Sequence, residues 1–213
     1  MAHESELELL VTLALRLKGF GEVVDVASVH GLDPAEVTAT LDAMAEAGRC
    51  MAREVDGVKK YVLTPTGRER GQSALAAELD AAGVRDAVQG AYETFLELNG
   101  QMLQLCTDWQ VTTDDAGEQV LNDHSDEDYD QEVMGRLVDL DGDLRKVLAP
   151  LRASLGRYDG YPGRFRTAID KLLGGDLDYF TKPIIPSYHT VWFELHEDLL
   201  ATLGIDRASE GST

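Results

Sequence analysis

The chain has 213 residues, of which 44% are hydrophobic and 27% are charged; this composition excludes an intrinsically disordered protein, and the length fits two globular domains. The formal net charge of −20 excludes a protein that nucleic acid or an anionic membrane attracts through net charge alone. Most of the acidity lies late in the chain, because residues 1–75 hold 8 basic and 12 acidic side chains and residues 76–213 hold 11 and 27.

Two helices are predicted in the first thirty residues. Ser5 and Glu8 have the spacing of a capping box, and leucines follow at helical spacing as far as Leu17. The first helix therefore begins near Ser5 and ends before Gly19. A second, shorter helix is expected over residues 22–30.

A third helix is predicted over residues 34–47. Asp33 stands directly before Pro34, and this pair is typical of an N-cap followed by the first helical residue, because Asp accepts free amides and Pro needs no acceptor. Helical spacing assigns three apolar residues to its inner face: Val37, Leu41 and Met44.

The residue pattern then changes from helical to alternating. Residues 50–55 and 58–63 are two β-capable runs, and Asp56 and Gly57 between them form a typical two-residue hairpin turn. Thr64 follows as the cap of a new helix. Helix, short helix, turn, helix and hairpin is the order of a winged helix-turn-helix.

No further strand is predicted after residue 72. The expected fold is mainly α with a small β-hairpin: a winged helix-turn-helix domain over residues 1–75 and an all-helical bundle over residues 76–213. A polar loop is expected over 111–126 and a frayed tail over 206–213. The predicted helices of the bundle span residues 72–80, 84–108, 127–155 with a kink or break near Pro150, 162–173, and 187–203.

The first domain resembles the MarR/PadR-type winged-helix regulators. Two segments within residues 5–75 carry the resemblance: DPAEVTATLDAMAEAG in the third helix and YVLTPTGRERG at the exit of the hairpin. The resemblance implies a dimeric transcription factor that places its third helix in the major groove and its wing along the phosphates. Duplex DNA and a second copy of the chain are then the expected partners.

The second domain resembles an uncharacterised helical domain of actinobacterial regulators and of proteins related to pyruvate phosphate dikinase. The segments that carry this resemblance are CTDWQ, NDHSDEDYD and SYHTVWFELHEDLLATLG. It implies no catalytic residues. In a regulator, a domain of this size dimerises, senses a small-molecule effector, or does both.

The outward residues of the third helix are the candidates for contacts with base edges. This set contains no Arg or Lys, the residues that most often contact guanine and phosphate. Thr and Ala can still contact a thymine methyl, and Glu can accept from cytosine. The set is Ala35, Glu36, Thr38, Ala39, Thr40 and Asp42.

Basic residues gather instead in and around the hairpin. Such clustering suits phosphate contacts, which supply most nonspecific affinity for DNA. The alternative interpretation is that these are ordinary solvated side chains. The candidates are Arg49, Arg53, Lys59, Lys60 and Arg68, with Arg70 close by in the sequence.

Aromatic and histidine side chains of the second domain are candidates for lining a ligand pocket, although packing in a core or an interface is the commoner role of aromatic residues. His189 and His196 are two helical turns apart, which is too far for two ligands on a straight helix to share one ion easily. The ligand-binding candidates are Trp109, His124, Tyr188, His189, Trp192 and His196.

No metal ion, cofactor or catalytic group is assigned, because no catalytic or nucleotide-binding motif is present. We therefore expect a DNA-binding transcriptional regulator rather than an enzyme. One alternative is a protein-interaction or regulatory subunit, such as one serving a phosphoenolpyruvate-utilising enzyme. A weaker alternative is a metal-binding enzyme in the helical domain. The acidic start of the chain and the lack of a long apolar run predict a cytoplasmic protein that has no membrane partner.

Overall fold

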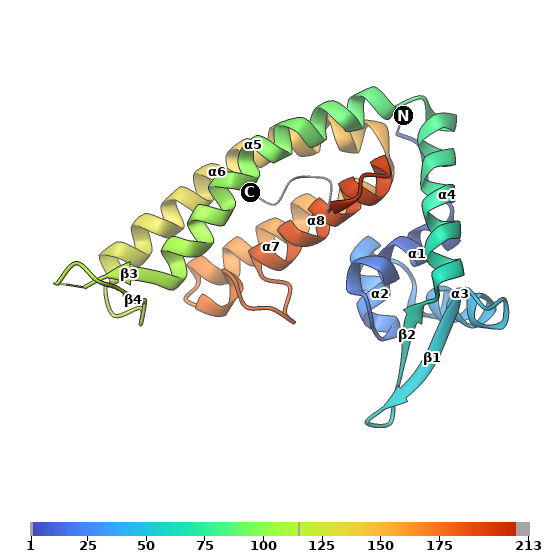
Figure 1. The fold of residues 1–213 in the computed structure, drawn as a ribbon, viewed down its shortest axis with the longest axis horizontal. Helices are drawn as coiled ribbons and strands as arrows, with labels where there is room; N and C mark the ends of the chain where they lie inside the picture. Colours follow the sequence, from blue (N-terminus) through green and yellow to red (C-terminus); the bar gives the residue numbers. More distant parts are fainter. Residues whose placement is uncertain (1, 115, 208–213) are drawn as a thin grey trace. The chain divides into compact units, whose positions relative to one another are not determined.

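The computed structural model describes residues 2–114 and 116–207 and is mainly α-helical with a small β-hairpin, as predicted (Figure 1). A second, very short hairpin lies in the later part of the chain. The elements are α1 Leu7–Lys18, α2 Val23–His30, α3 Pro34–Glu46, β1 Cys50–Val55, β2 Val58–Leu63, α4 Pro65–Ala82, α5 Arg85–Gln110, β3 Val111–Thr113, β4 Gln119–Leu121, α6 Glu127–Ser154, the 3₁₀ helix η1 Gly156–Gly160, α7 Tyr161–Leu173, the 3₁₀ helix η2 Leu177–Tyr179, and α8 Tyr188–Leu203.

The chain forms two compact units. Unit 1 combines Met1–Val88, Arg152–Gly160 and Glu194–Thr213, and unit 2 combines Gln89–Leu151 with Tyr161–Phe193. The sequence-based division places a single boundary after residue 75, whereas here the later part of the chain contributes two segments to unit 1. Helices α5, α6 and α8 each have residues in both units.

The first three helices begin and end close to their predicted limits, but the predicted capping box at Ser5 and Glu8 is wrong. The N-cap of α1 is Glu6, and no side chain caps it. Glu8 instead pairs with Arg49. A reciprocal cap occurs on α2, where the Glu22 side chain accepts from the amide of Asp25 and the Asp25 side chain from the amide of Glu22.

Helix α3 has the predicted cap and the predicted inner face. The Asp33 side chain accepts hydrogen bonds from the amides of Ala35 and Glu36 at 2.8 and 3.2 Å. The three predicted inward residues of α3 are fully buried in the core of unit 1 with apolar residues of α1, α2 and the hairpin. Burial of this apolar face fixes which side of α3 remains exposed.

Strands β1 and β2 form the predicted hairpin, called the wing below. Cys50 pairs with Leu63 and Val55 with Val58. Asp56 and Gly57 have φ angles of 53° and 77°, the positive values that a two-residue type I′ turn requires at both positions. Figure 1 shows the wing projecting from the helices of unit 1.

The segment that follows the wing is held by a close backbone approach. The Thr64 hydroxyl accepts from the amide of Gly67 and donates to the carbonyl of Gly48 at 2.8 Å. A Cβ at Gly67 would lie 1.9 Å from the carbonyl oxygen of Arg49, so only glycine lets α4 begin here. The Thr-Pro-Thr-Gly sequence is thereby explained as a cap followed by a contact without a side chain.

A buried polar network joins three distant segments of unit 1. The Arg157 side chain, from η1, is fully buried and pairs with Glu78 of α4. Its Nε lies 3.7 Å from Asp198 Oδ1 of α8, and its Nη2 donates to Thr202 at 2.6 Å. The hydroxyl of Tyr158 also donates to Asp198. One guanidinium thus balances two buried carboxylates.

Unit 2 is built on the long helices α5 and α6 with α7 and the first part of α8 (Figure 1). Phe95 and Trp192 have ring centroids 4.8 Å apart, and the Trp192 indole donates to Asn99 at 2.9 Å. Helix α6 continues through Pro150 to Ser154, so of the two alternatives predicted near Pro150, a kink or a break, the break is wrong.

The predicted absence of strands after residue 72 is also wrong. Residues 111–113 and 119–121 form the antiparallel hairpin β3–β4 within the segment predicted as a polar loop. Residues 206 and 207 of the predicted tail are described, and residues 208–213 lie outside the described residues. Within residues 2–114 and 116–207, no helix combines the length and apolarity needed to cross a bilayer.

Replacing Arg157 with Met is expected to lower the free energy of unfolding by about 3–5 kcal/mol, because the buried carboxylates of Glu78 and Asp198 would lose the guanidinium that lies between them. The matched control is Arg152→Met, which removes an exposed pair with Asp159 and should cost about 1 kcal/mol or less. Urea unfolding followed by circular dichroism measures both. Equal losses in the two variants would contradict the proposed role of Arg157.

Candidate functional site

The outward face of α3 consists mainly of small side chains. Ala35, Glu36 and Ala39 are exposed, as the helical spacing predicts. Thr38 and Thr40 are half-buried, and their hydroxyls donate to the carbonyl oxygens four residues earlier at 2.7 and 2.9 Å. The threonine hydroxyl protons are therefore used within the helix, which leaves methyl groups and the carboxylates of Glu36 and Asp42 as the chemistry that this face of α3 presents.

Lysines of the wing are paired with acidic residues of the helices. Lys59 donates to Asp42 of α3 at 2.7 Å, and the hydroxyl of Tyr61 donates to the same oxygen at 2.9 Å. Lys60 lies 3.3 Å from Glu22, at the start of α2. These pairs tie the wing to α2 and α3 and cancel much of the positive charge that the sequence places on the wing.

The arginines around the wing differ from one another. Arg49 pairs with Glu8 of α1. Arg53 of β1 and Arg68 of α4 are exposed, and their side chains have no hydrogen bond or ion pair with any described residue. Of the five basic residues predicted to contact DNA, these two remain available to an anionic partner without breaking an internal contact.

The pairing around Asp42 shifts three pKa values. The hydrogen bond from Lys59, with a second from Tyr61, holds the pKa of the Asp42 carboxyl below its ordinary value. The same hydrogen bond raises the pKa of Lys59, and burial is the main cause that raises the pKa of Tyr61. The first two shifts favour the charged forms of Asp42 and Lys59 near neutral pH, and the third keeps the Tyr61 hydroxyl protonated as a donor.

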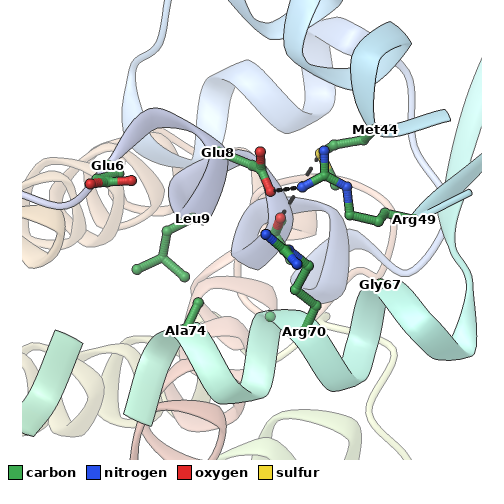
Figure 2. Close-up of a pocket in the computed structure, with 10 residues that line it drawn as sticks. Glu6, Glu8, Leu9, Met44, Arg49, Gly67, Arg70 and Ala74 are labelled. Atoms are coloured by element: carbon green, nitrogen blue, oxygen red, sulfur yellow. Dashed lines mark hydrogen bonds and ion pairs between the residues drawn. The ribbon is translucent and has the colours of Figure 1, made fainter. Parts of the chain in front are cut away.

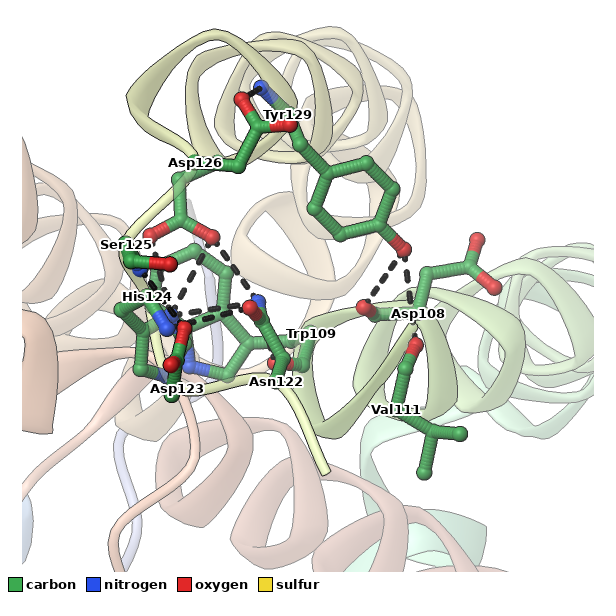
Figure 3. A network of polar contacts seen from close by, with 10 residues as sticks. Asp108, Trp109, Val111, Asn122, Asp123, His124, Ser125, Asp126 and Tyr129 are labelled. Atoms are coloured by element: carbon green, nitrogen blue, oxygen red, sulfur yellow. Dashed lines mark hydrogen bonds and ion pairs between the residues drawn. The ribbon is translucent and has the colours of Figure 1, made fainter. Parts of the chain in front are cut away.

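In unit 2, two of the predicted ligand-binding residues lie together. The His124 ring is 4.5 Å from the Trp109 ring, and Trp109 stacks on Phe180 at 4.4 Å. Figure 3 shows His124 within a polar network, where its Nδ1 lies 2.9 Å from Asp130 Oδ2. Asn122 donates to Asp130 and to the carbonyl of Trp109.

This network closes the β3–β4 hairpin against the ends of α5 and α6. Trp109 is only 3% exposed, so its indole is largely covered by the protein's own rings. His124 has a φ of 61°, an uncommon value for a residue other than glycine, held here by the hydrogen bonds on both sides of it. The arrangement stabilises a turn, and a ligand would have to displace one of these rings to reach the indole.

Of the other four predicted ligand-binding residues, His189 is linked to this cluster through its amide, which donates to the carbonyl of Phe180 at 3.0 Å. Tyr188 and Trp192 are buried and lie around Phe165, with Tyr188 and Phe165 centroids 4.8 Å apart. His189 is half-buried, and burial lowers its pKa. His196 belongs to unit 1. The aromatic residues thus contribute to the core of unit 2.

Groups suited to metal binding or nucleophilic catalysis are scarce. Within the described ranges, no three His, Cys, Asp or Glu side chains are arranged to hold a metal ion. Cys50 and Cys106 carry free thiols. Burial raises the pKa of Cys106 to about 11, so little reactive thiolate forms near neutral pH.

The sequence-based interpretation missed two features of the wing region. The first is the neutralisation of Lys59 and Lys60; its signal was Asp42, an outward acidic residue of α3 facing a lysine-rich strand. The second is a cavity behind α3 that Arg70 lines (Figure 2). The residue spacing within one helix cannot predict this cavity, because the cavity forms where three helices meet.

No protein-family model, curated protein or solved structure matches the chain. Function is therefore inferred from the contacts and charges of the chain itself.

Replacing Lys59 with Met is expected to raise the Asp42 pKa toward its ordinary value, because the strongest hydrogen bond to the carboxylate is removed. A carboxyl ¹³C NMR titration measures the Asp42 pKa. Lys146→Met is the control, because Lys146 pairs with Asp143 on α6 and not with Asp42. Since the folded-state pKa of Asp42 is lowered, its contribution to stability is present above the unfolded-state pKa and is lost as pH falls through the folded-state pKa. An Asp42 pKa that does not change would exclude the pairing.

Proposed function

We propose that the protein is a cytoplasmic, DNA-binding transcriptional regulator that contacts duplex DNA through α3 and the wing. The observation that carries the proposal is the exposed, small-residue face of α3, together with two unpaired arginines elsewhere in unit 1, Arg53 of β1 and Arg68 of α4. A helix without bulky outward side chains can approach base edges closely. Cations on flanking elements can then reach the phosphates on either side.

The roles of the residues follow from their chemistry. Ala35, Ala39 and the methyl groups of Thr38 and Thr40 suit contacts with thymine methyls, and Glu36 suits the amino group of cytosine. Arg53 and Arg68 supply phosphate contacts, which position the protein without reading sequence. This division predicts modest affinity, because few cations are available and the direct base contacts are mostly apolar.

The paired lysines limit nonspecific binding. Lys59 and Lys60 can contact phosphates only by sharing or leaving Asp42 and Glu22. Exposed ion pairs are weak, typically about 1 kcal/mol or less, so a strong field of phosphates can compete for the lysines. Asp42 then competes with the DNA phosphates for Lys59.

Unit 2 is proposed to supply dimerisation. A regulator of this kind binds as a symmetric dimer, with the two α3 helices about 34 Å apart, one turn of B-DNA. A symmetric pair also doubles the number of phosphate contacts, which offsets the small number of available arginines in each chain.

A protein-interaction role is the second candidate, and the same ion pairs favour it. With Lys59, Lys60 and Arg49 neutralised, α3 and the wing present Glu36 and Glu54 as well as Arg53. A mixed surface of this kind suits a protein partner better than a polyanion. In that case the chain would act as a regulatory subunit, and DNA would not bind.

Fluorescence anisotropy with labelled DNA from upstream of the protein's own gene tests the proposal at several salt concentrations. Arg53→Gln and Arg68→Gln should each weaken binding and reduce the slope of log K against log salt by about 0.9 for each phosphate that the variant no longer neutralises. Asp42→Asn should tighten binding, because it releases Lys59.

Arg152→Gln serves as the control, since it removes an exposed arginine far along the sequence and should leave the slope unchanged. No binding at low salt would exclude the regulator and favour the protein-contact candidate. If all four variants bind DNA with equal affinity, DNA remains a partner of the protein, but α3 and the wing are not the binding site.

A further inference from the structure

Helix α5, one of the long helices of unit 2 (Figure 1), carries a stripe of exposed, uncharged residues. Its members follow one another at intervals of four, three and four residues, which places them on one side of an α-helix. All of them are exposed, and the two leucines among them are 39% and 51% exposed. The α5 stripe consists of Leu96, Gly100, Leu103 and Thr107.

The α5 stripe is free of charge in a strongly acidic protein. Residues 98–107 contain no Asp, Glu, Lys or Arg, whereas 27% of the whole chain is charged and its net charge is −20. The next carboxylate, Asp108, is paired with Arg136 at 2.7 Å and accepts from Gln104 at 2.6 Å. Two copies of so acidic a chain repel each other. A contact between them therefore needs a surface without negative charge, and the α5 stripe provides one.

Gly100 has no function within the described part of the chain that requires glycine. Its φ is not positive, and a Cβ built on it would have no atom within 4 Å. Glycine in a helix interior is destabilising relative to alanine, so its presence needs another explanation. Elsewhere the chain uses glycine for close packing, since a Cβ at Gly71 of α4 would lie 2.6 Å from the Thr12 methyl group of α1. At Gly100, the closely packed helix would belong to another molecule.

The α5 stripe is self-complementary when a second copy packs on it in the antiparallel direction. Gly100 lies four residues after Leu96 and three residues before Leu103. A two-fold axis near Gly100 therefore places Leu96 opposite the partner's Leu103, and the two glycines face each other. A symmetric interface has this property, because residue i contacts residue j of the partner and j contacts i. The pattern fits a second copy of the chain, whereas an unrelated partner needs no such symmetry.

We propose that the chain forms a symmetric dimer in which the α5 stripes of two copies pack antiparallel. Leu96 and Leu103 form the apolar centre, and Gly100 lets the two backbones approach. The Thr107 hydroxyl donates to the Leu103 carbonyl at 3.0 Å, so it needs no partner in the contact. This assigns dimerisation to one face of one helix. Its effect on DNA binding rests on the proposed function, whereas the association of two chains does not.

Sedimentation velocity on the full chain tests the dimer at concentrations up to about 200 μM, because specific interfaces have Kd values of about 1 μM or lower. Leu96→Glu and Leu103→Glu each place two like charges in the apolar centre and should raise Kd about a hundredfold. Both side chains are exposed in the single chain, so circular dichroism should show unchanged helix content. A wild-type chain that stays monomeric, or an unchanged Kd in both variants, would overturn the proposal.

Val138→Glu on α6 is the matched control, because it adds the same charge at an apolar residue that is 42% exposed. Val138 lies between Gly135 and Gly142, which also have no atom within 4 Å of a built Cβ. Unlike the α5 stripe, this face is bordered by exposed charged residues such as Asp139 and Arg145. Val138→Glu should therefore leave Kd unchanged. A dimer that is lost in Val138→Glu and kept in Leu103→Glu would place the contact on α6 and contradict the proposal.

Gly100→Ala separates packing between chains from helix stability. It should raise the Tm of the monomer, measured together with Leu103→Glu, because alanine is the better helix former. It should nevertheless weaken the dimer, because the added methyl group holds the two helices apart. Gly90→Ala is the control: Gly90 also lies inside α5 with open space around it, but it is not on the stripe. Its replacement should raise Tm without changing Kd. Equal Kd values for Gly100→Ala and the wild type would exclude a crossing at Gly100.

Disulfide cross-linking tests the antiparallel direction. A mixture of Leu96→Cys and Leu103→Cys chains should form linked dimers under mild oxidation, because these positions face each other across the axis. Each variant alone should not, since residues 96 and 103 are about 10 Å apart along the helix and a disulfide needs Cα atoms within about 7 Å. Self-linking of each variant would indicate parallel helices and refute the proposed arrangement.

DNA binding by the same variants separates this proposal from the proposed function. Leu103→Glu should bind DNA more weakly than the wild type, and Val138→Glu should bind normally. If the chain dimerises through α5 but binds no DNA, the regulator proposal fails and the dimer stands. If DNA binds and the chain remains monomeric in sedimentation, the dimer contact fails alone.

Discussion

The pairing of Arg157 with Glu78 and Asp198 is the constraint on which unit 1 depends. Ions buried in a protein interior are stable only when each charge has its partner, so η1, α4 and α8 must meet at one point. Other contacts between the chain ends support the same arrangement: Lys18 donates to Glu194 at 2.7 Å, and Gln72 donates to the carbonyl of Ala201 at 2.7 Å. Helices α1 and α4 therefore pack against α8.

The charge that a surface offers to a partner differs from the charge that its sequence contains. Lys59, Lys60 and Arg49 each have a carboxylate from a neighbouring helix, while Arg53 and Arg68 have none. Three of these five cations thus stabilise unit 1 before they can contact anything else. The balance between internal and external partners sets how selective such a surface is for a strongly anionic ligand.

Local patterns were sufficient to predict most of the fold. Asp33 and Thr64 cap helices as expected, and Asp56-Gly57 forms the turn of the wing, because each depends on residues next to it in the chain. Strands β3 and β4 could not be predicted, because each has only three residues. Strand β4 is also exposed along its length, so apolar and polar residues do not alternate along it. The predicted break at Pro150 was wrong because an exposed proline can be accommodated on the solvent side of a long helix.

The candidate site was less predictable, for a physical reason. Exposure of Ala35 and Ala39 follows from helical spacing, but the partner of Lys59 or of Arg49 depends on how helices distant in sequence pack. Trp109 and His124 were predicted as ligand-binding residues, and they meet, yet they meet each other within a closed turn. Because Arg157 and α8 complete unit 1, residues 2–88 cannot finish folding until α8 has been synthesised. The segment that precedes unit 2 in the chain thus reaches its native state only after unit 2 has been made.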